Sequence, residues 1–180
     1  ENSCDIMQRT KGLQFNCCRF PPNLVDFEAI VEAMQTVPSF RQYYMTHFRW
    51  GQGRKETFCL IVYEPSVATL ECLGRIRMIF MDATFACCPD PFDQLFTIRA
   101  LLENGTFIIL GSAFMKRRTA GAYLRVLQAI KEKYPTLEPE YVMSDFENAI
   151  FVAAKNVFSK CSPQRLYISL WPGNVQGYIR

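Results

Sequence analysis

The sequence predicts an α/β fold built on a mixed β-sheet with helices on its flanks. Short apolar segments rich in strand-forming residues alternate with helix-like stretches in the second half of the chain. A strong hairpin signal, Asn104-Gly105, joins two of these segments, so we expect them to pair as antiparallel strands. A helix-like stretch separates them from a later apolar segment, which indicates a crossover to a parallel neighbour.

Residues 1–56 are predicted to form a lead-in and a helical extension. From Asn23 to Pro38, apolar residues recur at intervals of three and four, which predicts a helix with Asn23 as its N-cap. Its core-facing residues are Leu24, Phe27, Ile30, Val31 and Met34. Residues 40–50 interleave aromatic and basic side chains, which either stack on nucleic-acid bases or pack against the domain, and packing is the favoured interpretation.

Residues 57–158 are predicted to form the core, and residues 159–180 an atypical tail without a clear period. The expected elements are a strand at 57–63, a short helix or turn at 66–73, a strand at 75–81, strands at 94–102 and 107–115, a helix capped by Thr119, a strand at 141–144 and a helix through Phe158. Three meandering strands, a crossover helix and a fourth strand follow the order of a ribonuclease H-like domain.

Two of the predicted strands end on an acid, Asp82 and Asp145. The first strand is expected at the centre of the sheet, covered on both faces, with the 141–144 strand parallel beside it. The two carboxylates would then lie at neighbouring strand ends, within about 4 to 8 Å, where they repel unless a hard divalent cation separates them. The alternative is two independent carboxylates that serve turns or caps.

Composition excludes several classes of protein. The 49% hydrophobic content supports a sizeable core, and a formal net charge of +3 is too small to indicate nucleic-acid binding by bulk charge. The 8 cysteines show no C-x-x-C spacing and the only histidine is His47, so a structural zinc is not expected. No apolar run is long enough to span a bilayer. We expect mostly reduced thiols in an intracellular protein of the nucleus or cytoplasm, not a secreted one.

Any nucleic-acid contact must therefore come from local basic segments. Arg54 and Lys55 lie in a glycine-rich turn, and Lys116, Arg117 and Arg118 form a cluster after a predicted strand. These five residues are the candidate contacts to DNA phosphates, with weak, salt-sensitive and sequence-tolerant binding expected.

At its acid-tipped strands the sequence resembles the transposase domain of Mutator-like elements, the MULE family. The matching segments are Met81–Phe85, Phe92–Ile98, the helix after Thr119 and Met143–Ala149. The resemblance implies a DDE-type DNA transposase with a ribonuclease H-like core, a nuclear setting and Mg²⁺ or Mn²⁺ as cofactor. It makes Asp82 and Asp145 the first two catalytic, metal-binding acids, with DNA as the partner and a homo-oligomer as a candidate assembly.

The sequence departs from the family pattern after Asp145. The family places a Cys-x-x-His element and then a catalytic glutamate there, whereas here Cys161 is followed by Ser162 and no Asp or Glu occurs after Glu147. We expect a chain truncated before the third acid, or one whose end has a different origin. Glu147 is a substitute metal ligand by sequence, although at a helix start it is expected to serve the helix dipole instead.

Three hypotheses follow for function. The favoured one is a transposase-derived domain that is ancestrally a metal-dependent enzyme for DNA strand cleavage and transfer, inactive in this chain because two acids cannot hold two metal ions. The alternative is a domesticated, non-catalytic DNA-binding or protein-interaction module. A two-carboxylate hydrolase of unrelated ancestry is the weakest, because no phosphate loop or nucleophile motif is present.

Overall fold

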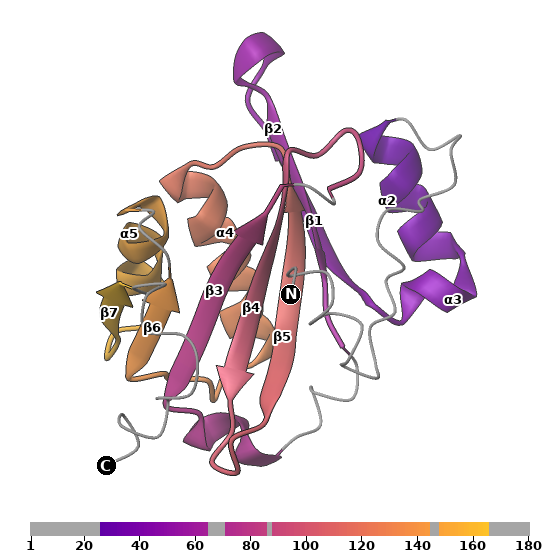
Figure 1. The fold of residues 1–180 in the computed structure, drawn as a ribbon. Coiled ribbons are helices and arrows are strands. Elements are labelled where there is room, and N and C mark those ends of the chain that lie inside the picture. The colour runs from indigo at the N-terminus through magenta and orange to yellow at the C-terminus, as the bar shows by residue number, and fades with distance from the viewer. Residues whose placement is uncertain (1–25, 65–70, 86–87, 145–147, 166–180) are drawn as a thin grey trace.

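A seven-stranded mixed sheet with helices packed against it forms the described part of the chain (Figure 1). The structure, a computed structural model, describes residues 26–64, 71–85, 88–144 and 148–165. The strands are β1 (Tyr44–Trp50), β2 (Thr57–Val62), β3 (Met78–Thr84), β4 (Gln94–Leu101), β5 (Phe107–Met115), β6 (Tyr141–Ser144) and β7 (Ser162–Arg165), in the spatial order β1-β2-β5-β4-β3-β6-β7. The helices are α2 (Phe27–Thr36), α3 (Pro38–Arg41), α4 (Ala120–Lys133) and α5 (Asn148–Val157), with short 3₁₀ turns η1 (Gly53–Lys55) and η3 (Glu71–Arg75). None of the described helices is long and apolar enough to cross a membrane.

The predicted antiparallel meander and its parallel neighbour are confirmed. β3 pairs with β4 and β4 with β5, both antiparallel, while β6 lies parallel on the other side of β3. The β4–β5 turn contains Gly105 at φ 80°, and the Thr106 N–H donates to the Asn104 side-chain oxygen at 3.0 Å. α4 supplies the crossover, and the Thr119 hydroxyl accepts from the Ala122 N–H as its predicted N-cap.

The position of Asp82 within its strand corrects the sequence prediction. The strand expected at 75–81 runs from Met78 to Thr84, so Asp82 lies inside it, opposite Thr97, and not directly after it. The antiparallel pairing with β4 continues as far as Thr84, which keeps the backbone extended past the acid. The expected cover on both faces is partial, because Met81 is buried while Phe80 is only half-buried.

The extension before the core also differs from its prediction. α2 begins at Phe27, and its N-cap is Asp26, whose carboxylate accepts from the Ala29 N–H at 2.8 Å. Asn23, the expected cap, lies outside the described residues. β1 was not predicted; it pairs antiparallel with β2 and so extends the sheet into residues 44–50. β7, in the stretch expected to be an atypical tail, pairs in parallel with β6.

Two hydrophobic clusters cover the two faces of the sheet. The larger cluster joins the sheet to α4 and α5, and the smaller one packs α2 on the opposite face. Alternate residues of β2 divide between them: Cys59 faces the larger cluster and Phe58 the smaller one, where its ring stacks on Phe27 with centroids 4.6 Å apart. The smaller cluster therefore anchors α2 to the sheet by aromatic contacts.

Gly111 in β5 is predicted to be essential for the packing of α4. A Cβ built there would lie 2.6 Å from the Ile130 Cδ1 and 3.1 Å from the Val62 carbonyl oxygen, and Ile130 is fully buried. We expect Gly111→Ala to lower the free energy of unfolding by about 1 to 3 kcal/mol, measured by urea denaturation. Gly121→Ala in α4, where nothing lies within 4 Å, is the matched control and should not destabilise. A Gly111→Ala protein as stable as wild type would contradict this packing.

Candidate functional site

Asp82 lies in a row of polar side chains that crosses the meander. In the strand register it is opposite Thr97 of β4, and Thr97 is opposite Ser112 of β5. The Ser112 hydroxyl donates to the Thr97 hydroxyl at 3.4 Å, and Thr97 is buried whereas Asp82 is exposed. Neighbouring strand residues such as Met81 and Ile98 belong to the larger cluster, so this polar row lies on the sheet face opposite α4.

The second predicted acid follows the strand beside β3. Ser144, the last residue of β6, is opposite Met81 in the parallel register, and its side chain is fully buried. Asp145 and Glu147 lie outside the described residues. The approach of Asp145 to Asp82 therefore stays a prediction, based on the observed register of β3 and β6.

The oxygen ligands around Asp82 fit a hard divalent cation in kind. Asp82 supplies a carboxylate, and the hydroxyl of Thr84, two residues later in β3, belongs to the same face, whereas the buried Ser144 is opposite Met81 and belongs to the other face. Oxygen ligands of this type suit Mg²⁺ or Mn²⁺. Among the described residues no group of three or more His, Cys, Asp or Glu side chains is close enough to hold a metal. A complete site would need the acids that follow β6.

The structure brings the two predicted basic segments together. Arg54 and Lys55 lie in η1, between β1 and β2, and Lys116 to Arg118 follow β5. β2 and β5 pair antiparallel, and the Lys116 N–H donates to the Phe58 carbonyl at 3.0 Å. The Arg117 guanidinium donates to the Arg54 carbonyl oxygen, although 63 positions separate them in sequence. We call Arg54, Lys55, Lys116, Arg117 and Arg118 the basic patch.

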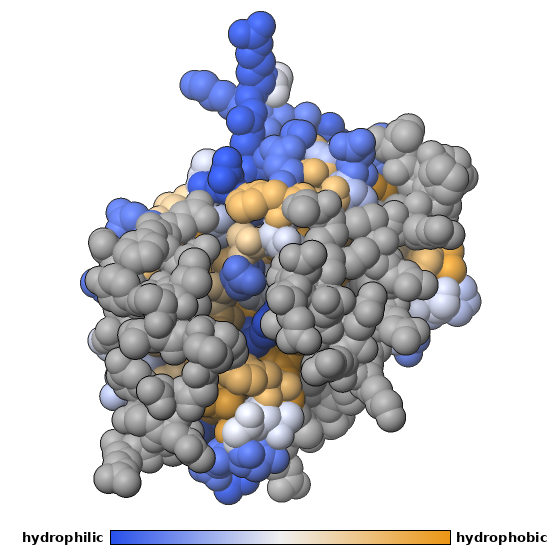
Figure 2. Space-filling model, viewed as in Figure 1, coloured by the Kyte–Doolittle hydropathy of each residue, from blue (hydrophilic) through white to orange (hydrophobic). Residues whose placement is uncertain are grey.

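The charges of the basic patch are not equally available. Lys116 pairs with the Asp93 carboxylate at 2.9 Å, which offsets part of its charge. Arg54, Lys55 and Arg118 are exposed and form no ion pair with any described residue. The hairpin that carries η1 projects beyond the rest of the sheet in Figure 1, and Figure 2 shows its tip as strongly hydrophilic.

Asp82 and the basic patch lie at the same end of the sheet. The register aligns Thr84, Leu95, Phe114 and Leu60 in one row across β3, β4, β5 and β2. Asp82 is two residues before Thr84, and Lys116 is two residues after Phe114. This end is the upper one in Figure 1.

The aromatic stretch before the core is used for packing, as the favoured interpretation predicted. Phe48 and Trp50 of β1 pack against the larger cluster, and Phe40 against the smaller one. The Arg125 guanidinium lies 4.9 Å from the Trp50 ring centroid and so covers part of that ring. These rings are therefore less available to nucleic-acid bases than the sequence alone suggested.

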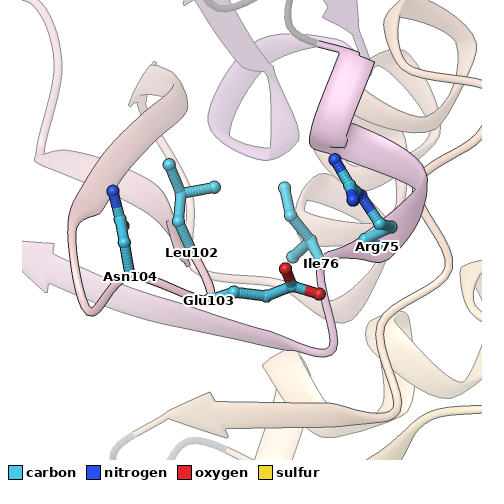
Figure 3. A pocket seen from close by; sticks show the side chains of 5 residues that line it. All are labelled: Arg75, Ile76, Leu102, Glu103 and Asn104. Atoms are coloured by element: carbon cyan, nitrogen blue, oxygen red, sulfur yellow. The ribbon is translucent and has the colours of Figure 1, made fainter.

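A small pocket of about 230 Å³ lies at the opposite end of the sheet. It is lined by Arg75, Ile76, Leu102, Glu103 and Asn104, beside η3 and the β4–β5 turn (Figure 3). None of the predicted site residues lines it. Sequence reasoning identified Asn104 only as a turn residue and gave no signal for a pocket.

Two of the described cysteines are poor nucleophiles. Cys59 and Cys161 are free thiols. Burial raises the pKa of the Cys59 thiol to about 12 and also raises the pKa of Cys161, so both remain protonated at neutral pH.

Comparison with known proteins gives one family. A family model described as the MULE transposase domain matches residues 78–168, which is half of the chain. No curated protein matches the sequence. The matched segment begins at the first residue of β3 and includes Asp82, Asp145 and the Lys116–Arg118 cluster, whereas Arg54 and Lys55 precede it.

Proposed function

Because the chain belongs to the MULE transposase family, we propose that it is a transposase-derived domain that binds DNA across the end of the sheet carrying Asp82. The observation that supports this proposal is the arrangement of the basic patch. Two segments far apart in sequence supply five cationic side chains at that end, and Arg117 joins them through the Arg54 carbonyl. A DNA ligand favours a nuclear location.

DNA binding of this kind depends on phosphate contacts. A cation that neutralises a phosphate releases counterions, so the affinity falls as the salt concentration rises. The overall charge of +3 is small, but the basic patch gathers cationic side chains from two segments at this end of the sheet, where a duplex would meet them together. Such contacts do not read base edges, so we propose sequence-tolerant binding.

Asp82 and Asp145 are the residues we propose for a divalent ion, Mg²⁺ or Mn²⁺, with Glu147 as a further candidate ligand. A bound ion of this type polarises a phosphate oxygen and lowers the pKa of a coordinated water. The role of Asp82 in this scheme is to hold the ion from a rigid strand, because β3 is paired on both sides.

Strand cleavage is the ancestral activity of the family, and we propose that these 180 residues bind DNA without cutting it. A two-metal site needs enough anionic oxygens to hold two doubly charged ions close together. No Asp or Glu follows Glu147 in the sequence, and Asp93 is engaged by Lys116. The residues present therefore favour at most a weak, single-ion site.

The DNA proposal predicts an unequal effect of charge removal. We expect the double variant Arg54→Gln, Lys55→Gln to bind a duplex about tenfold more weakly in moderate salt, and its slope of log affinity against log salt to fall by about two. Lys116→Gln is the matched control, with a smaller loss, because Asp93 already offsets its charge. Fluorescence anisotropy across a salt series measures both. Equal losses in the two variants, or no loss in either, would overturn the assignment of free charge to the hairpin.

The metal proposal predicts that Asp82→Asn weakens Mn²⁺ binding at least about tenfold, because a neutral amide replaces an anionic ligand. Electron paramagnetic resonance of free Mn²⁺ measures this loss, and Asp93→Asn is the control that should bind as wild type does. The wild-type chain, incubated with supercoiled plasmid and Mn²⁺, should leave it intact. Unchanged Mn²⁺ binding in Asp82→Asn would refute the site. Nicking that disappears in Asp82→Asn would show that a third acid completes it.

A further inference from the structure

We infer that Phe85 and Arg118 form a stacking site for an unpaired nucleobase of the bound DNA, an inference that rests on the proposed function. Phe85 directly follows β3 and is three residues after Asp82. Its side chain is 51% exposed, more than any other large hydrophobic side chain in the described part of the chain. A single exposed hydrophobic side chain is common on protein surfaces, so the inference rests on the cation beside this ring and on its position next to Asp82.

The Arg118 guanidinium already lies over this ring. It is 5.0 Å from the ring centroid, an arrangement in which the cation is attracted to the aromatic face. Arg118 forms no ion pair with a described residue, so its charge remains available to a phosphate. Arg118 covers one face of the ring, but unlike Trp50, which packs against the larger cluster, Phe85 remains 51% exposed with the arginine in place. The uncovered ring surface is open to a base, and the cation is available to the phosphate that follows it.

This chemistry identifies an unpaired nucleotide as the ligand. Bases inside a duplex are stacked on each other, so a protein ring reaches a base face without unstacking a base step at a strand end, a mismatch or a flipped position. The other members of the basic patch would hold the adjoining duplex by its phosphates. Within the basic patch, Arg117 contacts the Arg54 carbonyl and Lys116 contacts Asp93, while Arg118 lies over the exposed Phe85 ring.

Among the described residues, a second exposed aromatic side chain provides a comparison. Tyr141, at the start of β6, is 37% exposed and is opposite Met78, at the far end of β3 from Asp82. It is remote from the basic patch. A substitution there tests whether any exposed ring gives the same effect.

The test compares a blunt duplex with the same duplex carrying a short single-stranded overhang that contains 2-aminopurine. We expect wild type to bind the overhang at least about fivefold more tightly than the blunt end, the range that stacking of one base supplies. Phe85→Leu, which keeps an apolar side chain but removes the ring, should reduce the ratio of overhang affinity to blunt-duplex affinity to about one. Phe85→Tyr should keep the ratio, and so should Tyr141→Leu. The 2-aminopurine emission at saturation should be lower with wild type than with Phe85→Leu.

The outcomes separate this inference from the proposed function. The stacking site is overturned if wild type binds the overhang and the blunt duplex equally, or if Phe85→Leu keeps the wild-type ratio of overhang affinity to blunt-duplex affinity. The DNA proposal stays intact in either case, provided that the blunt duplex binds in a salt-dependent way. Absence of salt-dependent binding to either DNA overturns both. Thermal melting of Phe85→Leu close to that of wild type shows that a lost ratio is not a loss of folding, and Tyr141→Leu controls for a general effect of removing an exposed ring.

Discussion

The antiparallel pairing of β2 with β5 is the contact on which the rest of the structure depends. It joins the β1–β2 hairpin to the meander and places Leu60 in the same row as Phe114 and Thr84. Without this pairing, the turn that carries Arg54 would have no fixed position relative to the basic residues 116–118. The backbone bond from the Lys116 N–H to the Phe58 carbonyl continues this pairing beyond the strands. One backbone register therefore determines which end of the sheet carries the basic patch.

Packing on the two faces keeps that register rigid. The larger cluster holds α4 against the sheet, and the close approach of Ile130 to Gly111 makes this contact specific in shape. Inside the cluster the Tyr134 hydroxyl donates to the Leu110 carbonyl at 2.8 Å, which satisfies a polar group far from water. Burial raises the Tyr134 pKa, so the phenol stays protonated and this hydrogen bond persists through the neutral pH range. The polar row around Asp82 lies on the opposite face, where the sheet presents hydroxyl and carboxylate groups.

Local sequence signals predicted the elements that depend on local physics. The Asn104-Gly105 turn fixed the β4–β5 hairpin, and Thr119 marked the start of α4, as the structure confirms. The approach of Arg117 to Arg54 depends on the pairing of strands separated by most of the core, and no local pattern encodes it. β1 was not predicted because its sequence lacks the alternation of apolar and polar residues that marks a strand with one buried face. In the structure six of its seven residues are partly buried, so both faces have similar exposure. Asp82 was identified by its position after an apolar run, whereas the exposure of Phe85 could not be read from the sequence, because an aromatic residue after a strand is more often buried.

Hydrogen exchange of the protein with and without bound duplex DNA tests most directly whether this end of the sheet is the functional one. The expected result is slower amide exchange, on DNA binding, in the η1 hairpin, in residues 82–85 and in the segment after β5 that contains Arg117. The β4–β5 turn at Gly105 and the η3 turn lie at the other end and should exchange at unchanged rates. Slower exchange confined to that other end, with no change around Asp82 and the hairpin, would contradict the account.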